Sequence, residues 1–199
     1  MYQNDTVILD DSRTAYPATH CQLNSGGQVS ALLARNNSTV EVLGGNIGHN
    51  LQAEGNSNIV VRGGTVGSYA HALDNGVLTI YGGVFNGPVC SNDTGTVNVK
   101  GGTINDWLEV FDSTIYLYGS NFKVGGVDLK YGDNLRDYGT VGSNQFWFIG
   151  TITGTLSDNS QLNTSFGIHT DTDGAIIISP EPATVLLLGL GGLMLRKKF

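Results

Sequence analysis

The sequence contains few cysteines, few prolines and few basic residues. Its 199 residues include 2 cysteines and 4 prolines, and 10 Lys plus Arg stand against 17 Asp plus Glu. Two cysteines are too few for a disulfide framework or a cysteine metal cluster. The net charge of −7 argues against nucleic-acid binding, because few cations are present to offset the phosphates. A content of 40% hydrophobic and 14% charged residues argues against a disordered chain and predicts a domain with a core.

The histidines and the N-terminus indicate neither a metal site nor an export signal. His20, His49, His71 and His169 pair neither with one another nor with cysteine at ligand spacing, so no metal or cofactor is predicted. The first residues, MYQNDTVILDD, lack the basic and apolar regions of a signal peptide and resemble the interior of a fold. We therefore expect Met1 to be an internal start of a longer protein. The alternative is a protein that is not exported.

The C-terminus has three parts in a fixed order. They are a proline motif, an apolar run and a basic end: Pro180, Glu181 and Pro182; Ala183, Val185, Leu186, Leu187, Leu188, Leu190, Leu193 and Leu195; Arg196, Lys197 and Lys198. The 13 residues of the run 183–195 are fewer than the roughly 20 that span a bilayer comfortably. With snorkelling basic residues, we expect the run to form a short hydrophobic helix that enters a membrane, its basic end cytoplasmic. The alternative is a buried C-terminal helix.

These three elements resemble the PEP-CTERM sorting signal of Gram-negative bacteria. The resemblance covers only about the last 20 residues and concerns destination, not the activity of the body. It implies export by the Sec machinery, transient anchoring in the inner membrane and processing by exosortase. It also implies a final place at the cell surface or outside the cell, in cells that make exopolysaccharide. Proteins with such tails normally carry a Sec signal peptide, which this sequence does not show at Met1.

The body of the chain contains a repeat marked by glycine pairs. Successive pairs follow at steps of 18, 19, 19 and 19 residues and begin at Gly26, Gly44, Gly63, Gly82 and Gly101. Alternating segments precede the later glycines: TVEVL, NIVVR, VLTIY, TVNVK and TIYLY. This period is too short for helical repeats or propeller blades, and the spaced leucines of leucine-rich repeats are missing. It fits one coil of a parallel β-helix with about three short strands. The predicted fold class is all-β: a right-handed parallel β-helix with a C-terminal β cap and a short C-terminal hydrophobic helix.

Stacking of coils about 4.8 Å apart places equivalent residues in columns. Two apolar columns are predicted to face inward: Val40, Ile59, Leu78, Val97 and Ile115; Val42, Val61, Ile80, Val99 and Leu117. The glycine pairs recur because each turn needs a positive φ or passes too close to its neighbours for a Cβ atom. Cys21 and Cys90 fall at least three coils apart, on the order of 15 Å, whereas a disulfide needs Cα atoms within about 7 Å.

The repeat divides the chain into four segments. Residues 1–37 read as degenerate N-terminal coils, residues 38–126 as regular coils, and residues 180–199 as the sorting segment. In residues 127–179 the period fades, and FWFIGTITGTLSDNSQLNTSF reads as two alternating strands around a Ser-Asp-Asn-Ser turn. With Ala175–Ile178, these strands are predicted to form a β cap over the open end of the solenoid.

One outward column alternates cations with tyrosines. It contains Arg62, Tyr81, Lys100 and Tyr118, predicted to stack about 5 Å apart. Aromatic faces can stack on sugar rings while the cations meet acidic or hydroxylated glycans, so the column is a candidate glycan-binding surface. The alternative is a ladder that only stabilises an exposed sheet.

Catalysis is the less favoured interpretation. Asp74, Asp93 and Asp112 occupy equivalent repeat positions, so neighbours would lie about 5 Å apart, near the spacing of paired glycosidase acids. Aspartate is also common at such corners simply as a turn former, and Glu41 alone lies near the basic Arg62. We therefore predict no catalytic residue and expect an exported surface or matrix protein with a structural, adhesive or glycan-binding role. The alternatives are a polysaccharide lyase or hydrolase, and a non-functional fragment of a larger surface protein.

Overall fold

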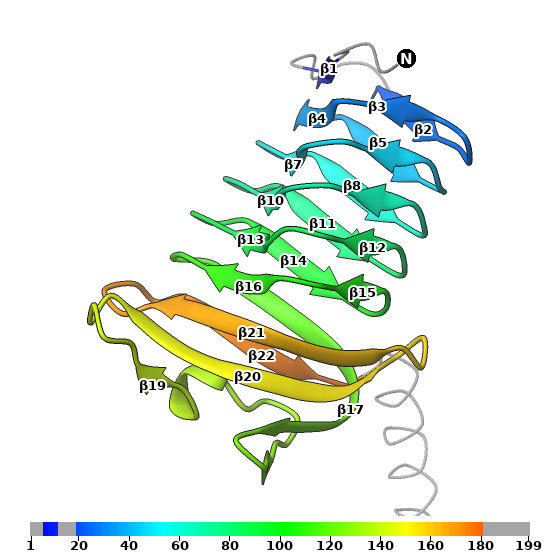
Figure 1. Ribbon diagram of the computed structural model, residues 1–199. Helices are drawn as coiled ribbons and strands as arrows, with labels where there is room; N and C mark the ends of the chain where they lie inside the picture. Colours follow the sequence, from blue (N-terminus) through cyan, green and yellow to red (C-terminus); the bar gives the residue numbers. More distant parts are fainter. Residues whose placement is uncertain (1–5, 12–18, 181–199) are drawn as a thin grey trace, which may run out of the picture.

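The computed structural model describes residues 6–11 and 19–180, which form an all-β solenoid closed by a β cap (Figure 1). Within these residues the chain makes five complete coils between His20 and Val110, each with three short strands. Aligned strands of successive coils build three parallel sheets along the stack. The predicted all-β solenoid with coils of about 19 residues is confirmed.

Each coil contributes one strand to each sheet in the order I, II, III. Sheet I contains β2 His20–Leu23, β5 Thr39–Val42, β8 Asn58–Val61, β11 Val77–Ile80, β14 Thr96–Val99, β17 Thr114–Val124 and β22 Ala175–Ser179. Sheet II contains β3 Gln28–Val29, β6 Asn46–Ile47, β9 Thr65–Val66, β12 Val84–Phe85 and β15 Thr103–Ile104. Sheet III contains β1 Thr6–Asp11, β4 Ala31–Asn36, β7 Leu51–Ala53, β10 Ala70–Ala72, β13 Val89–Ser91, β16 Trp107–Val110 and β21 Gln161–His169. Neighbours within each sheet pair in parallel.

The core is a stack of identical apolar columns. Both inward columns predicted from the sequence are buried, with every member at most 2% exposed. The register pairs Val40 with Ile59 and Ile59 with Leu78, so each coil presents an aliphatic side chain to the next. Because side chains alternate across a strand, two apolar residues per four-residue strand are enough to line the interior.

The glycine pairs stand where neighbouring coils approach closely. Gly64 has a φ of +92°, and a Cβ atom there would lie 2.7 Å from the carbonyl oxygen of Gly45 in the preceding coil. Both reasons predicted for the pairs therefore apply at this corner, since the backbone is left-handed and no side chain fits.

Residues 20–36 contain the first described coil. Strands β2, β3 and β4 form a complete coil that pairs in register with the next one, and Cys21 stands opposite Val40 on the inward side. Cys90 lies in β13 of another sheet, and both thiols are free.

The cap continues the solenoid with long strands. The predicted hairpin is present: β20 Trp147–Leu156 pairs antiparallel with β21, which itself adds to β16 of sheet III. Strand β22 adds to β17 of sheet I, while β18 Val127–Asp128 and β19 Thr140–Val141 are short antiparallel additions. The 3-10 turn η1 Leu135–Asp137 carries Arg136, which donates hydrogen bonds to the carbonyl oxygens of Thr170 and Thr172. Buried Phe122 and Phe166 fill the end of the core beneath these strands.

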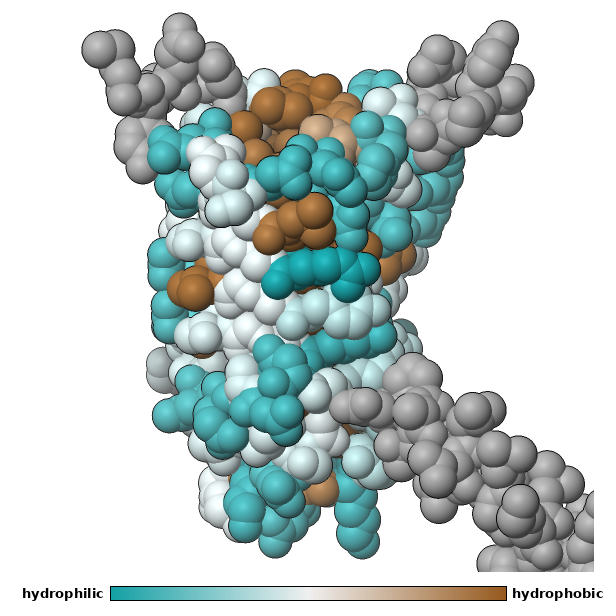
Figure 2. Space-filling model, turned by 90° about the vertical axis from the view of Figure 1, so that its right-hand side faces the viewer, coloured by the Kyte–Doolittle hydropathy of each residue, from teal (hydrophilic) through white to brown (hydrophobic). Residues whose placement is uncertain are grey.

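The outside of the solenoid is mainly polar or neutral. Figure 2 shows one side on which hydrophilic and neutral residues predominate and hydrophobic residues form separate patches, the largest at the N-terminal end. Residues 6–11 and 19–180 contain no helix long and apolar enough to cross a membrane. Most of the predicted sorting segment, namely Glu181, Pro182, the apolar run 183–195 and the basic residues 196–198, lies outside the described residues, as does Met1.

Candidate functional site

The cations and tyrosines predicted to share a column do contact one another. The column Arg62, Tyr81, Lys100 and Tyr118, here called the cation–tyrosine ladder, follows the outer side of sheet I. The guanidinium carbon of Arg62 lies 4.9 Å from the ring centroid of Tyr81, and the ammonium nitrogen of Lys100 lies 5.1 Å from it. Lys100 also lies 4.8 Å from the ring centroid of Tyr118. Adjacent coils thus exchange cation–π contacts along the stack.

Polar contacts extend the ladder toward the N-terminus. The guanidinium of Arg62 donates to a carboxylate oxygen of Glu41 at 2.8 Å, and the amide nitrogen of Gln22 donates to the other oxygen at 2.9 Å. The hydrogen bond from Arg62, followed by the one from Gln22, lowers the pKa of Glu41. At the other end, the hydroxyl of Tyr118 donates to the side-chain oxygen of Asn98 at 3.2 Å. One chain of side-chain contacts therefore joins all five coils and the strand β17 that follows them.

The ladder leaves little ring face open for a ligand. Arg62 belongs to the coil before Tyr81 and Lys100 to the coil after it, so the two cations cover opposite faces of the ring. Tyr81 as a whole residue is 40% exposed. This geometry suits a stabilising ladder, and glycan binding by its residues stays a prediction.

The three repeated aspartates occupy a left-handed corner. Asp74, Asp93 and Asp112 have φ values of 52°, 56° and 42°, and Asn36 and Gly55 take the same conformation in earlier coils. Aspartate, asparagine and glycine are the residues that adopt this backbone most readily. The need for a left-handed turn explains the aspartates without any catalytic role.

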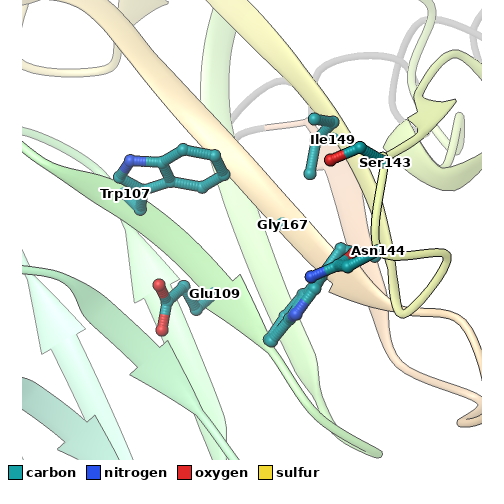
Figure 3. Close-up of a pocket in the computed structure, with 8 residues that line it drawn as sticks. Trp107, Glu109, Ser143, Asn144, Ile149 and Gly167 are labelled. Carbon is teal, nitrogen blue, oxygen red and sulfur yellow. The ribbon is translucent and has the colours of Figure 1, made fainter.

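A pocket that the sequence did not reveal lies where the last regular coil meets the cap. Its volume is about 310 Å³, and its lining residues, here called the tryptophan pocket, are Trp107, Glu109, Gly142, Ser143, Asn144, Trp147, Ile149 and Gly167. The chain has 2 tryptophans, and both line this pocket. Figure 3 shows Glu109 and Trp107 on one side of Gly167, with Asn144, Ser143 and Ile149 on the other.

Strand register explains why the pocket is recessed at its centre. Gly167 of β21 pairs with Glu109 of β16 on one side and with Ile149 of β20 on the other. Paired residues face the same side of a sheet, so larger neighbours surround a position that has no side chain. A Cβ atom on Gly167 would lie 3.1 Å from Cε3 of Trp147 and 3.6 Å from Cε3 of Trp107. The missing side chain leaves the floor of the pocket open between the two indoles.

Trp147 is held in place by an aromatic cluster. Its ring meets Phe111 edge-on at 4.7 Å and His169 edge-on at 5.3 Å between centroids. His169 in turn stacks on Phe111 at 5.1 Å and on Phe146 at 6.4 Å. Such contacts restrict the rotamers of the ring, so the indole surface is organised before any ligand arrives.

The charged group that lines the tryptophan pocket is the carboxyl of Glu109, which has no cationic partner in the described part of the chain. Burial raises the pKa of Glu109, and the nearby negative charge of Asp106 adds to this. The thiol of Cys90 donates a hydrogen bond to Glu109 with a sulfur–oxygen distance of 3.6 Å, and this bond lowers the pKa of Glu109. Burial, followed by the charge of Glu109, raises the pKa of the Cys90 thiol, so Cys90 is a poor nucleophile.

A second, more polar pocket shares Trp107. Its volume is about 190 Å³, and its lining residues, here called the polar pocket, are Asn105, Asp106, Trp107, Thr151, Asn163, Thr164 and Ser165. The hydroxyl of Thr164 donates to the carbonyl oxygen of Asp106 and so ties the cap to the last coil. Hydroxyl, amide and carboxylate groups next to an indole are what recognition of a hydroxyl-rich ligand requires.

A signal for this site is present in the sequence but is not periodic. Trp107 occupies the column position of Tyr69 and Pro88, and Glu109 that of His71 and Cys90, so the last coil departs from its predecessors. Glu109 places a carboxylate where the preceding coils have Gln52, His71 and Cys90, and Trp107 places an indole where the coil before has Pro88, so this surface differs from that of the preceding coil. Trp147 comes from outside the repeat, and no spacing rule connects it to Trp107.

No protein-family model, curated protein or solved structure matches the chain. Among the residues that the structure describes, no group of three or more His, Cys, Asp and Glu side chains is arranged to hold a metal ion. The fold and the two pockets are therefore the basis for a functional assignment.

Proposed function

We propose that this protein is an exported β-solenoid of the cell surface or extracellular matrix that acts by binding glycan. The observation that carries this proposal is the convergence of both tryptophans on one recessed pocket with a carboxyl and amide groups at its edge. Indole faces pack against the apolar faces of sugar rings, and polar groups around them accept and donate hydrogen bonds to hydroxyls. The stabilised ladder on sheet I supplies a rigid body for this site.

The destination part of the proposal rests on the C-terminal motif. Strand β22 ends at Ser179, immediately before Pro180, so the folded cap ends where the predicted sorting signal begins. Proline keeps the motif extended and accessible to exosortase. We further propose that the run 183–195 forms a short helix in the inner membrane of a Gram-negative bacterium. The coils are proposed to be right-handed, as parallel β connections almost always are.

Tryptophan fluorescence provides a direct test of binding. Because both tryptophans line the pocket, an occupying ligand should change their emission. Titration of the full chain with exopolysaccharide from PEP-CTERM-bearing bacteria should give a saturable change that Trp107→Ala abolishes. The matched control is Tyr69→Ala, which removes a 45% exposed ring from the same column in an earlier coil. An unchanged spectrum at saturating glycan would contradict the binding role and leave the fragment interpretation.

A separate experiment tests sorting. Deletion of residues 180–199 should release the protein from membranes in a fractionation of Gram-negative cells that carry exosortase. The control replaces Arg62 with Ala and leaves the tail intact. Membrane association that survives the deletion would contradict the sorting proposal without affecting the glycan site.

A second candidate function, polysaccharide hydrolysis, is favoured by Glu109 alone. A carboxyl with a raised pKa beside an indole is the arrangement of a general acid in glycosidases. Hydrolysis also needs a second carboxylate, and Asp106, whose charge acts on Glu109, lines the polar pocket and not the tryptophan pocket. Release of reducing ends from a bound glycan, lost in Glu109→Gln while binding persists, would favour the enzyme over the binding protein.

A further inference from the structure

The two pockets at the cap meet at Trp107, and together they are here called the extended site. Trp107 lines both of them, and Ser165 of the polar pocket stands two residues before Gly167 on β21. Two residues of a strand span about 7 Å, which is comparable to the length of one sugar ring. The two pockets together are therefore long enough for two neighbouring sugar units, one over Gly167 and one beyond Trp107.

The charge of this extended site is negative on both sides of Trp107. Glu109 contributes to the tryptophan pocket and Asp106 to the polar pocket, while no Lys, Arg or His is among the described residues that line either one. Glu109 also forms no salt bridge within the described part of the chain, in contrast to Glu54, which pairs with Arg35 at 2.9 Å. A partly buried carboxylate without a counter-ion is costly, and a cationic ligand offsets that cost.

We infer that the extended site binds two consecutive rings of an amino-sugar glycan with free ammonium groups, one of which pairs with Glu109. The indoles of Trp107 and Trp147 add a cation–π attraction for the same group. Uronic-acid and sulfated glycans are repelled by the two carboxylates. This inference rests on the proposed function and specifies its ligand class.

The test compares four oligosaccharides on the full chain by tryptophan fluorescence and calorimetry. The probes are β-1,4-linked tetramers of glucosamine, N-acetylglucosamine and glucose, and a tetramer of galacturonic acid. We expect the glucosamine tetramer to bind roughly tenfold more tightly than the N-acetylated one. Its ammonium group adds one ion pair, and a roughly tenfold gain in affinity is what an ion pair of modest strength contributes. Glu109→Gln should remove this preference, and Trp107→Ala should abolish binding of both.

Matched variants separate charge and folding effects from the site itself. Glu54→Gln, directly after strand β7 of the same sheet, changes the net charge by the same amount, and Tyr69→Ala removes an aromatic ring from the column of Trp107. Both variants should leave binding unchanged. The amino-sugar inference would be overturned if the tetramers of glucosamine, N-acetylglucosamine and glucose bound equally well and Glu109→Gln did not alter their binding. Glycan binding itself would then remain intact. Preferential binding of the galacturonic-acid tetramer would overturn it as well. No fluorescence change with any tetramer would contradict both this inference and the proposed function.

Discussion

Trp107 and Trp147 flank one missing side chain. Cε3 of each indole lies within 3.6 Å of the point where a Cβ atom of Gly167 would stand. Trp107 belongs to the last regular coil and Trp147 to the cap, so the pocket exists only because strand β21 joins the two. Gly167 is thus the position at which the geometry of the pocket is most sensitive to substitution.

The first prediction concerns that glycine. Gly167→Ala should weaken glycan binding by roughly tenfold or more, because a methyl group would occupy the floor between the indoles. The control is Gly48→Ala, whose Cβ atom would find its nearest neighbour at 3.7 Å and should change nothing. Fluorescence titration measures both. Undiminished binding by the Gly167 variant would place the ligand elsewhere.

The second prediction concerns the cation–tyrosine ladder. Tyr81→Leu should lower the free energy of unfolding by about 1–2 kcal/mol, because two exposed cation–π contacts of about 0.5–1 kcal/mol each are lost. Tyr81→Phe keeps the ring between Arg62 and Lys100 and should be close to the parent protein. Urea denaturation compares the two. Equal stability of the leucine and phenylalanine variants would show that the cation–π contacts contribute little.

The third prediction concerns the left-handed corner. Asp93→Val should destabilise the protein by about 1–2 kcal/mol, because a β-branched residue is strained at a φ of 56°. Asp93→Gly should be at least as stable as the parent, since Gly55 occupies the same corner naturally. Thermal unfolding measures the difference. Loss of a glycan-degrading activity in Asp93→Asn, with normal stability, would instead support the catalytic alternative.

The fourth prediction concerns pH and Glu109. Its pKa in the folded protein lies above the unfolded value of 4.5, so the folded state binds more protons between the two values. Stability contributed at this site therefore falls as pH rises through that window, and Glu109→Gln should be more stable than the parent at neutral pH. The gain should disappear at about pH 4, near the reference carboxyl pKa. The groups that act on Glu109 are Cys90 of β13 and Asp106 before β16, while its partners on β21 and β20, Gly167 and Ile149, do not titrate.

Glu41 provides the opposite case on the same molecule. Hydrogen bonds from Arg62 and Gln22 lower its pKa, so the stability it contributes is present above the unfolded pKa and is lost as pH falls through the folded one. Glu41→Gln should therefore lower stability at neutral pH, and its effect should vanish in acid. Denaturant titrations of Glu109→Gln and Glu41→Gln across this pH range test whether the two substitutions change stability in opposite directions. Parallel pH profiles for the two variants would contradict the assigned environments.

The repeat could be predicted because its information is local. A spacing near 19 residues, glycines at the corner and two apolar residues per strand define each coil, and parallel stacking repeats the same contacts. The columns of Val40 and Val42 and the order of Arg62, Tyr81 and Lys100 follow from that period alone. The cap hairpin was also predictable from alternation around its turn.

The tryptophan pocket depends instead on pairing between distant segments. Nothing in the period indicates that β21 lies beside β16 in parallel or that Gly167 stands opposite Glu109. A shift of β21 by one residue would turn every side chain of the strand to the other face and would expose Phe166, which is buried in this register. Local spacing thus specifies a solenoid, because each coil repeats its neighbour. The position of a pocket at its end follows from the non-repeating cap, whose strands pair with coil strands distant in the sequence.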